Sequence, residues 1–214
     1  MTALLKIDPR KPDKETLTKI SKILREGGII AFPTETFYGL GVDARREEAV
    51  EKIFRIKGRN VRNPVSVIVD SEEEVIPLVA EIPEAARFLM KKFWPGPLTL
   101  VFCAAPPVSS HLTGGTGKIG IRVSSHPIAG GLAKRLSGPL TATSANLSGG
   151  QECTTAADVI HIFDDRLDAI IDGGPTPGGM GSTILDVTVY PPLVLRAGAV
   201  SLAEILESVG IPAR

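Results

Sequence analysis

The sequence has 214 residues, of which 43% are apolar and 22% charged, as is ordinary for a folded globular protein. Its 24 Lys and Arg residues balance 24 Asp and Glu residues, so the net charge gives no argument for a nucleic-acid-binding protein, although a local basic patch stays possible. Two cysteines without a C-x-x-C or C-x-x-H spacing exclude a disulfide framework and give no sign of a zinc site. The first residues lack an apolar signal core, and no apolar run approaches the ~18 residues of a membrane span, so we expect a cytoplasmic protein without membrane contact.

The first half of the chain alternates between helical and strand patterns. Apolar residues at helical spacing predict two amphipathic helices that each end at glycine, and short apolar runs predict strands between and after them. A Trp-Pro-Gly-Pro turn precedes the later strands. The predicted helices cover 13–26, 46–57, 72–80 and 83–93, and the predicted strands cover 29–32, 65–69, 98–102 and 119–123.

The second half continues this alternation and shows no repeat, low-complexity tract or linker. We therefore expect one domain over 1–214, with a core over about 15–200. Because strands and helices are interleaved but several strands follow one another, the pattern predicts an α/β fold around a single twisted, mixed sheet. The predicted helices cover 127–136, 156–163 and 201–208, and the predicted strands cover 140–143, 169–172, 182–187 and 193–196.

A basic segment ends the second predicted helix at Lys57-Gly58-Arg59. Lys57 falls on the apolar stripe of this helix, where a lysine either extends to solvent or meets an anion. Residues 52–69 contain several cations and no acidic residue. Lysine and arginine there suit phosphate or carboxylate binding. The alternative is a solvated basic helix end that complements the helix dipole.

The loop over 33–39 places two threonines, a glutamate and a tyrosine just beyond a buried strand, where ligands often bind in open α/β sheets. A structural turn is the alternative. The Gly39-x-Gly41-x-x-Ala44 pattern does not qualify as a dinucleotide fingerprint, because its glycines do not follow the strand directly. The segment 113–118 lacks the glycine and the Ser or Thr of a P-loop, which favours a flexible hairpin.

Further polar residues stand in or after predicted strands. Arg122 interrupts an apolar strand, so it is either exposed or paired, for example with a ligand carboxylate. Ser144 and Asn146 follow a strand and either bind a ligand or cap the turn. Ser182 and Arg196 lie at strand ends and suit an anionic ligand. The three histidines show no metal spacing; we expect Cys103 in the core and Cys153 in an exposed loop.

Seven motifs follow one another along the chain, namely Pro33–Gly41, Lys57-Gly58-Arg59, Trp94–Thr99, Arg122-Val123, Thr143–Gly149, Ser182–Asp186 and Leu195–Gly198. The order of these motifs is more specific than any one of them. It resembles the YrdC-like family of threonylcarbamoyl-AMP synthases over about residues 15–200, in the short, single-domain form without an extra C-terminal domain. The resemblance implies a YrdC-like α/β domain with a twisted mixed sheet, flanking helices and a concave basic cavity.

The resemblance implies an L-threonylcarbamoyladenylate synthase, a nucleotidyltransferase that uses L-threonine, bicarbonate or CO2, and ATP with Mg²⁺. Pyrophosphate is released, and a separate transferase complex then moves the threonylcarbamoyl group to an adenosine of tRNA. In this reaction the threonine amine attacks CO2, and the carbamate attacks the α-phosphorus. The protein then contributes positioning and charge neutralisation, which accounts for the lack of a triad or carboxylate pair.

The resemblance also implies residue roles. The nucleotide side would comprise Lys57, Arg59, Asn63, Ser144, Asn146 and Arg196, with Lys57 and Arg59 as catalytic residues and the Lys57 and Ser144 motifs on opposite walls. The threonine side would comprise Thr36, Arg122 and Ser182, with Thr34 and Thr143 as neighbours. No protein metal site is expected. This sequence departs from many relatives at three places. Asn60 replaces a proline, Ile68 replaces a histidine that touches threonine, and Cys153-Thr154 replaces a Ser-Pro pair.

A non-catalytic, YciO-like protein that binds RNA or the ribosome is the alternative. The basic stretch 52–62 is compatible with tRNA or double-stranded RNA. That branch lacks the Lys-x-Arg and Ser-x-Asn pairs, which are both present here and favour the synthase. The carbamoyl-transfer domain of hydrogenase maturation proteins would require zinc-finger and acylphosphatase regions, which we do not expect in 214 residues with two cysteines.

Overall fold

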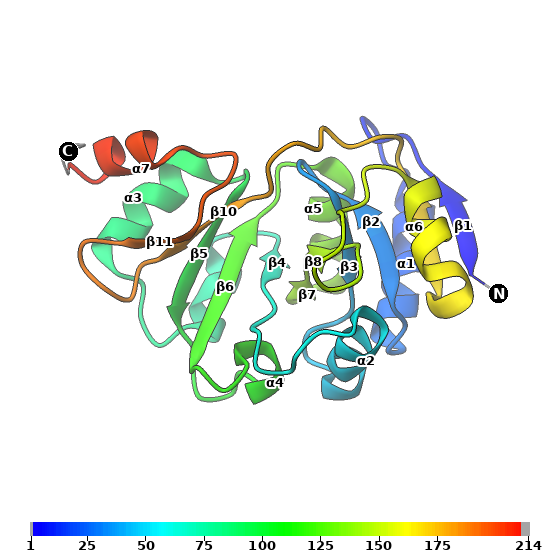
Figure 1. Cartoon of the computed structure of the whole chain (residues 1–214), viewed down its shortest axis with the longest axis horizontal. Helices are drawn as coiled ribbons and strands as arrows, with labels where there is room; N and C mark the ends of the chain where they lie inside the picture. The colour runs from blue at the N-terminus through cyan, green and yellow to red at the C-terminus, as the bar shows by residue number, and fades with distance from the viewer. Residues whose placement is uncertain (1, 211–214) are drawn as a thin grey trace.

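The computed structural model describes residues 2–210, whose strands form two mixed sheets rather than the single sheet expected from the sequence (Figure 1). In the first sheet, β1, β9 and β2 are parallel, and β3 and β8 continue antiparallel to them. Its spatial order is β1 (Ala3–Lys6), β9 (Ala169–Asp172), β2 (Ile30–Pro33), β3 (Tyr38–Gly41) and β8 (Thr143–Ser144).

The second sheet is also mixed, with parallel pairs β10–β5 and β4–β6 and antiparallel pairs elsewhere. Its order is β11 (Leu193–Arg196), β10 (Thr183–Asp186), β5 (Leu98–Cys103), β6 (Lys118–Val123), β4 (Val67–Val69) and β7 (Leu140–Thr141).

The chain crosses from the second sheet to the first at Ala142, between β7 and β8. The amide of Thr141 donates to Val42 O at 3.0 Å, and the amide of Ala142 donates to Ser66 O at 2.8 Å. This extended segment is therefore bonded to both sheets. The single strand that the sequence predicted over 140–143 is divided between them. The crossover brings the inner edges of the two sheets together.

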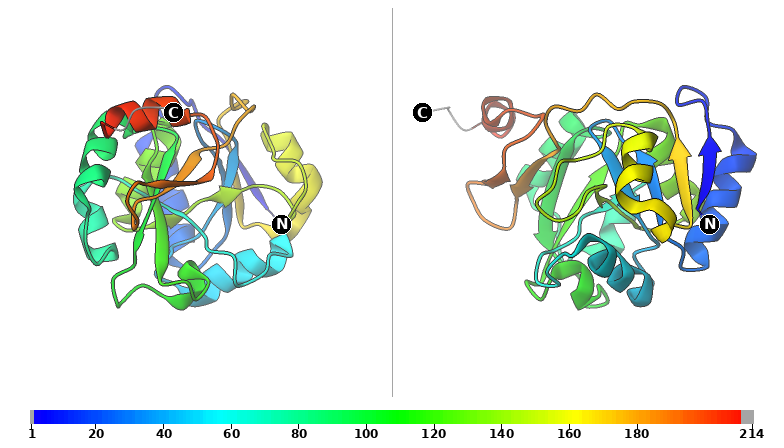
Figure 2. Two further views of the ribbon diagram at one scale, coloured as in Figure 1. Left: turned by 60° about the vertical axis from the view of Figure 1, so that its left-hand side comes forward. Right: turned by 45° about the vertical axis from the view of Figure 1, so that its right-hand side comes forward.

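Helices cover the outer faces of both sheets (Figures 1 and 2). Helices α1 and α5 pack against each other behind the first sheet, while α3 and α7 lie together beside the second, on the opposite side of the molecule from α6. The helices are α1 (Lys14–Arg25), α2 (Glu47–Lys57), α3 (Glu84–Phe93), α4 (Ser110–Thr113), α5 (Pro127–Leu136), α6 (Ala156–Phe163) and α7 (Leu202–Ser208), with 3-10 segments η1 (Glu73–Leu78) and η2 (Asp164–Arg166).

Two hydrophobic clusters form the core, one on each face of the central strands. Ile30 and Phe32 of β2 point to the cluster under α1 and α5, whereas Ala31 points to the larger cluster, which includes residues of α2, α3 and α6. Strand β4 divides in the same way, with Ile68 in the α1–α5 cluster and Val67 in the other. This alternation follows from the two-residue period of a strand. Both faces are buried, so the strand sequences are uniformly apolar.

Several details differ from the sequence prediction. The α-helix expected over 72–80 is a short 3-10 helix because Pro77 lies inside it. Strand β3 was interpreted as loop because it contains Gly39 and Gly41; a Cβ at Gly41 would lie 2.7 Å from the Phe32 ring, so this glycine permits close packing of β2. The predicted hairpin over 113–118 begins in the short helix α4.

The structure differs from the sequence prediction in two further respects. The edge strand β1 was not predicted, because its half-exposed residues Ala3–Lys6 lack a clear alternation. Cys103 is exposed, whereas Cys153 is buried, the reverse of the expected placement. Among the helices within residues 2–210, none is both long and apolar enough to cross a membrane.

Candidate functional site

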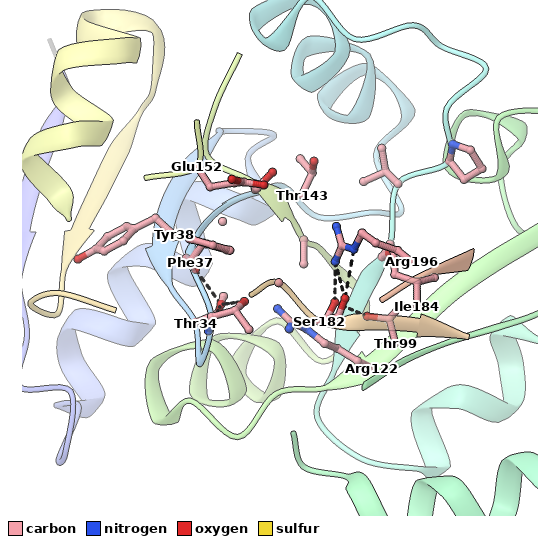
Figure 3. Close-up of a pocket in the computed structure, with 18 of the residues that line it drawn as sticks. Thr34, Phe37, Tyr38, Thr99, Arg122, Thr143, Glu152, Ser182, Ile184 and Arg196 are labelled. Carbon is pink, nitrogen blue, oxygen red and sulfur yellow. Dashed lines mark hydrogen bonds between the residues drawn. The ribbon is translucent and has the colours of Figure 1, made fainter. Parts of the chain in front are cut away.

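A polar cavity lies between the two sheets, next to the crossover segment (Figure 3). The β2–β3 loop and β8 form one side, and residues of β5, β6, β10 and β11 form the other. Eight residues named from the sequence line it, namely Thr34, Thr36, Arg59, Arg122, Thr143, Ser144, Ser182 and Arg196. The structure thus brings together the predicted threonine side and half of the predicted nucleotide side, namely Arg59, Ser144 and Arg196. Three predicted residues, Lys57, Asn63 and Asn146, do not line this cavity.

Lys57 lies behind the cavity wall rather than opposite Ser144. Its side chain is buried, and its ammonium donates to the carbonyl of Ser144, to Asn146 O at 2.7 Å and to Asn146 Oδ1 at 3.0 Å. The expectation of opposite walls is therefore wrong, because the two motifs are in direct contact. Burial, followed by the nearby charge of Arg59, lowers the pKa of Lys57 to about 8.

Asn146 connects this buried lysine to the cavity surface. Its Oδ1 also accepts a hydrogen bond from Ser144 Oγ at 2.8 Å, and its Nδ2 donates to Gly150 O at 2.6 Å. The Ser144 hydroxyl is thereby held at the cavity wall by a chain that ends at Lys57. The Ser-Ala-Asn motif is a rigid turn whose first residue faces the cavity.

Arg59 follows the left-handed C-cap glycine of α2, where Gly58 has φ 60°. Its guanidinium donates to Asn63 O at 3.3 Å and to Pro64 O at 2.8 Å. Asn63 thus contributes its backbone, and its side chain is exposed. The departure at Asn60 preserves this loop, because Asn60 Oδ1 accepts from the amide of Arg62 at 2.9 Å and Asn60 O accepts from the amide of Asn63.

Arg196 and Ser182 form the opposite end of the cavity (Figure 3). The Arg196 guanidinium donates to Ser182 O at 2.7 Å and to Ser182 Oγ at 3.1 Å, and this hydroxyl lies 3.0 Å from Thr99 Oγ1. The approach requires Gly198, where a Cβ would lie only 2.4 Å from Gly181 O. Gly198 therefore lets the turn that carries Arg196 lie against the residues at the start of β10.

Arg122 lies on β6 and is buried, with an ion pair of 2.9 Å between its Nη1 and Glu35 Oε1. The second oxygen of Glu35 accepts a hydrogen bond from Ser124 Oγ. Of the two options that the sequence left open, exposed or paired, the structure shows a paired arginine. Glu35 belongs to the β2–β3 loop, so this contact joins the two sheets across the site.

Burial lowers the pKa of all three cavity arginines. Burial lowers the pKa of Arg59, and the charge of Arg196 lowers it further. Burial and the charge of Arg122 lower the pKa of Arg196 in the same way. For Arg122, burial lowers the pKa and Glu35 opposes this effect. Clustered, partly desolvated cations of this kind are stabilised by an anion, so the cavity suits a phosphate or carboxylate ligand.

The β2–β3 loop is held in place by its own hydroxyls. Thr34 Oγ1 donates to Phe37 O at 2.7 Å and lies 3.1 Å from Thr36 Oγ1. The phenol of Tyr38 points away from these hydroxyls and donates to Gly174 O at 2.8 Å (Figure 3). Burial, with the charge of Asp172, raises the pKa of Tyr38 to about 12. Tyr38 is therefore a structural donor, and the threonines remain for a ligand.

The sequence interpretation assigned no role to several residues of the site. Glu152 and Thr99 line the cavity, and Glu35 supports Arg122 from behind. Thr99 belongs to the Trp94–Thr99 motif, and Glu35 belongs to the loop over 33–39 that follows β2. Ile68, by contrast, is fully buried in the α1–α5 cluster and is not part of the cavity wall. Within residues 2–210, no group of three or more His, Cys, Asp or Glu side chains could hold a metal ion.

Comparisons with known proteins agree with this fold and site. A family model for Sua5, YciO and YrdC proteins, described as "Telomere recombination", matches residues 22–198. The threonylcarbamoyl-AMP synthase of Pyrococcus abyssi is 44% identical over 187 residues, which are 87% of this chain and 55% of that protein. The chain therefore spans little more than half the length of this relative.

Solved structures show the same fold. The crystal structure of P. abyssi Sua5 complexed with L-threonine gives a TM-score of 0.94 at 40% identity, over 98% of this chain and 61% of that chain. Escherichia coli YciO gives a TM-score of 0.89 at 28% identity, over 96% of this chain and 100% of that chain. The two sheets, the arginine cavity and the match over residues 22–198 together show that this chain belongs to the Sua5/YciO/YrdC family.

Proposed function

We propose that this protein is an L-threonylcarbamoyladenylate synthase and therefore a nucleotidyltransferase. The observation that carries the proposal is the convergence of Arg59, Arg122 and Arg196 on one cavity that is also lined by hydroxyl groups. The names of its relatives support it, since P. abyssi has a threonylcarbamoyl-AMP synthase 44% identical to this chain and a Sua5 protein solved with L-threonine.

The reaction joins three substrates without a covalent enzyme intermediate. The amine of L-threonine forms a bond to the carbon of CO2 and loses a proton; if bicarbonate is the source, water is also released. A carbamate oxygen then attacks the α-phosphorus of ATP. The bond from this phosphorus to the β-phosphate oxygen breaks, and pyrophosphate leaves with the electron pair. Charge develops on phosphate oxygens throughout, so arginines are suitable groups to stabilise it.

The placement of the side chains supports a set of residue roles. We propose that Arg59, Ser144 and Arg196 bind the nucleotide, and that Arg122, Ser182 and Thr36 bind threonine through its carboxylate and hydroxyl. Lys57, Asn146 and Asn63 would support this site from behind, by holding Ser144 and Arg59 in place. ATP would enter as its Mg²⁺ complex, with the metal carried on the phosphates.

A pyrophosphate-release assay tests the proposal. Purified protein with Mg²⁺–ATP, bicarbonate and L-threonine is expected to release pyrophosphate in proportion to threonine, and mass spectrometry is expected to detect threonylcarbamoyl-adenylate. Release without threonine dependence would refute the synthase. Complementation of cells that lack their own synthase then tests the place in tRNA modification, where a separate transferase complex would consume the product.

A YciO-like role is the second candidate, because E. coli YciO matches over its full length. In that case the protein would bind RNA through its basic residues and form no adenylate. A mobility-shift titration with tRNA and double-stranded RNA distinguishes the two roles. RNA binding without threonine-dependent pyrophosphate release would favour the YciO-like role.

A further inference from the structure

Glu35 joins the two halves of the predicted threonine side. Its loop carries Thr34 and Thr36 and belongs to the first sheet, whereas Arg122 and Ser124 belong to the second sheet and the segment that follows it. One carboxylate oxygen pairs with Arg122 Nη1 at 2.9 Å, and the other accepts from Ser124 Oγ. The Glu35 side chain is 12% exposed, and that of Arg122 is 8% exposed. Both oxygens of this carboxylate are therefore engaged in a largely buried bridge.

The bridge occupies only part of the Arg122 guanidinium. An arginine carries five N–H donors, and within residues 2–210 Glu35 is the only hydrogen-bond partner found for them. Arg122 nevertheless lines the cavity, where its guanidinium lies between Thr34 and Ser182 (Figure 3). The remaining donors are thus available to a ligand carboxylate in the cavity, where the hydroxyls of Thr34 and Ser182 would lie beside it.

The loop that carries Glu35 is also held by backbone hydrogen bonds. The amide of Thr34 donates to Phe37 O at 3.2 Å, and the amide of Gly178 donates to Thr36 O at 2.9 Å. Glu35 therefore projects from a hydrogen-bonded turn toward the longer side chain of Arg122, which has more rotatable bonds. In such an arrangement the carboxylate fixes the guanidinium, as expected for a planar donor group held by charge-assisted hydrogen bonds.

We propose that Glu35 is a positioning residue that holds Arg122 so that its free donors bind the carboxylate of the amino-acid substrate. The inference rests on the proposed function, because it concerns the same site. One measurable effect distinguishes this positioning role of Glu35 from a purely structural role. Loss of Glu35 should weaken ligands that have a carboxylate, and it should leave analogues without one nearly unaffected.

The test compares L-threonine with L-threoninol, which keeps the amine and hydroxyl but lacks the carboxylate. Calorimetry measures both dissociation constants for the wild type, Glu35→Asp and Glu35→Gln. Glu35→Asp keeps the charge but shortens the side chain by one methylene, so it separates position from charge. Both variants are expected to weaken L-threonine binding about tenfold or more, the loss of one charge-assisted contact, and L-threoninol binding about twofold or less.

Two controls accompany these variants. Glu48→Gln removes an exposed carboxylate on α2, outside the cavity, and it is expected to keep the wild-type ratio of L-threonine to L-threoninol affinity. Ser124→Ala removes the second partner of Glu35 and is expected to give a smaller loss with the same preference between the ligands. It also serves as the test if the Glu35 variants fail to fold. Equal losses for both ligands, or tighter L-threonine binding by Glu35→Gln, would overturn the proposal.

A ligand-free measurement separates this proposal from the proposed function. If the wild type does not bind L-threonine, the synthase assignment fails, and hydrogen–deuterium exchange still tests the bridge. Exchange of residues 33–39 and 119–124 is expected to rise in Glu35→Asp, while that of α1 stays at the wild-type level. Unchanged exchange in both segments would show that Glu35 does not hold them together.

Discussion

Lys57 Nζ donates two hydrogen bonds to Asn146, at 2.7 Å to its backbone oxygen and at 3.0 Å to its Oδ1. A third goes to the carbonyl of Ser144, which completes the three donors of an ammonium group. In return, the amide of Ser148 donates to Lys57 O at 2.9 Å. The end of α2 and the Ser144–Asn146 turn are thus fastened to each other, although they are far apart in the sequence.

This arrangement predicts that Lys57→Met destabilises the fold. The substitution keeps most of the apolar stem but leaves three acceptors without their donor, so we expect a loss of about 2 kcal/mol in the free energy of unfolding. Urea denaturation measures it. Lys91→Met, on the exposed face of α3, is the control and should change stability by no more than about 0.5 kcal/mol. A Lys57 variant as stable as this control would contradict the bonding seen here.

The pKa of Lys57, lowered to about 8 mainly by burial, predicts a stability change at alkaline pH. Between pH 8 and the ordinary lysine value of 10.5, the unfolded chain keeps a proton that the folded protein has lost. The free energy of unfolding therefore contains a Lys57 contribution that increases with pH across this window. The stability difference between wild type and Lys57→Met should grow from pH 8 to pH 10.5, as measured by urea denaturation. A constant difference would mean that Lys57 titrates normally.

The sequence predicted this contact only in part. The position of Lys57 on an apolar helical stripe indicated burial or an anion, and the order of motifs indicated that Lys57 and Ser144 share a site. Local pattern cannot show which acceptors an ammonium finds, because these come from a turn 87 residues away. The expectation that the two motifs form opposite walls of the site was therefore wrong, while their membership of one site was predicted.

The division into two sheets was hidden for a related reason. Residues 140–144 form one extended run, and the change of partner at Ala142 depends on hydrogen bonds to Val42 and Ser66 from elsewhere in the chain. The helices were predicted well because their caps and periodicity are local, as at Asp13, whose side chain accepts from the Thr16 amide at 2.7 Å. The Glu35–Arg122 pair was not predicted, since a pairing between two loops or strands leaves no periodic signal.

Arg59 is expected to contribute directly to nucleotide binding. It lines the cavity, and burial together with Arg196 makes its charge unfavourable without an anion. Arg59→Ala should lower kcat/KM for ATP at least about tenfold, roughly 1.4 kcal/mol in transition-state stabilisation. Arg55→Ala is the matched control, because Arg55 is exposed on the preceding turn of α2. Equal kinetics for the two variants would remove Arg59 from the site.

The two cysteines should differ sharply in reactivity. Cys153 is 1% exposed, and burial, with the charge of Asp158, raises the pKa of its thiol to about 11. Cys103 is exposed at the end of β5. Because the thiolate is the nucleophile that attacks the disulfide of the reagent, the native protein should react at one cysteine, and Cys103→Ser should react only after denaturation. Ellman's reagent measures both. Rapid labelling of native Cys103→Ser would show that Cys153 is accessible.

Gly198 controls the position of Arg196. A Cβ at this position would lie 2.4 Å from both Gly181 O and Thr183 N, so Gly198→Ala must displace the turn that follows β11. We expect a loss of about 1–3 kcal/mol in stability, as for overpacking of a tight site, and a higher KM for ATP through misplacement of Arg196. Gly130→Ala in helix α5 is the control, because the nearest atom to its added Cβ would be Ser124 O, at 3.6 Å. That change should be neutral or stabilise the fold by up to about 1 kcal/mol, since alanine restricts the unfolded chain. If Gly198→Ala matches Gly130→Ala in both denaturation and ATP kinetics, the close approach of residues 181 and 198 is not what places Arg196 in the cavity.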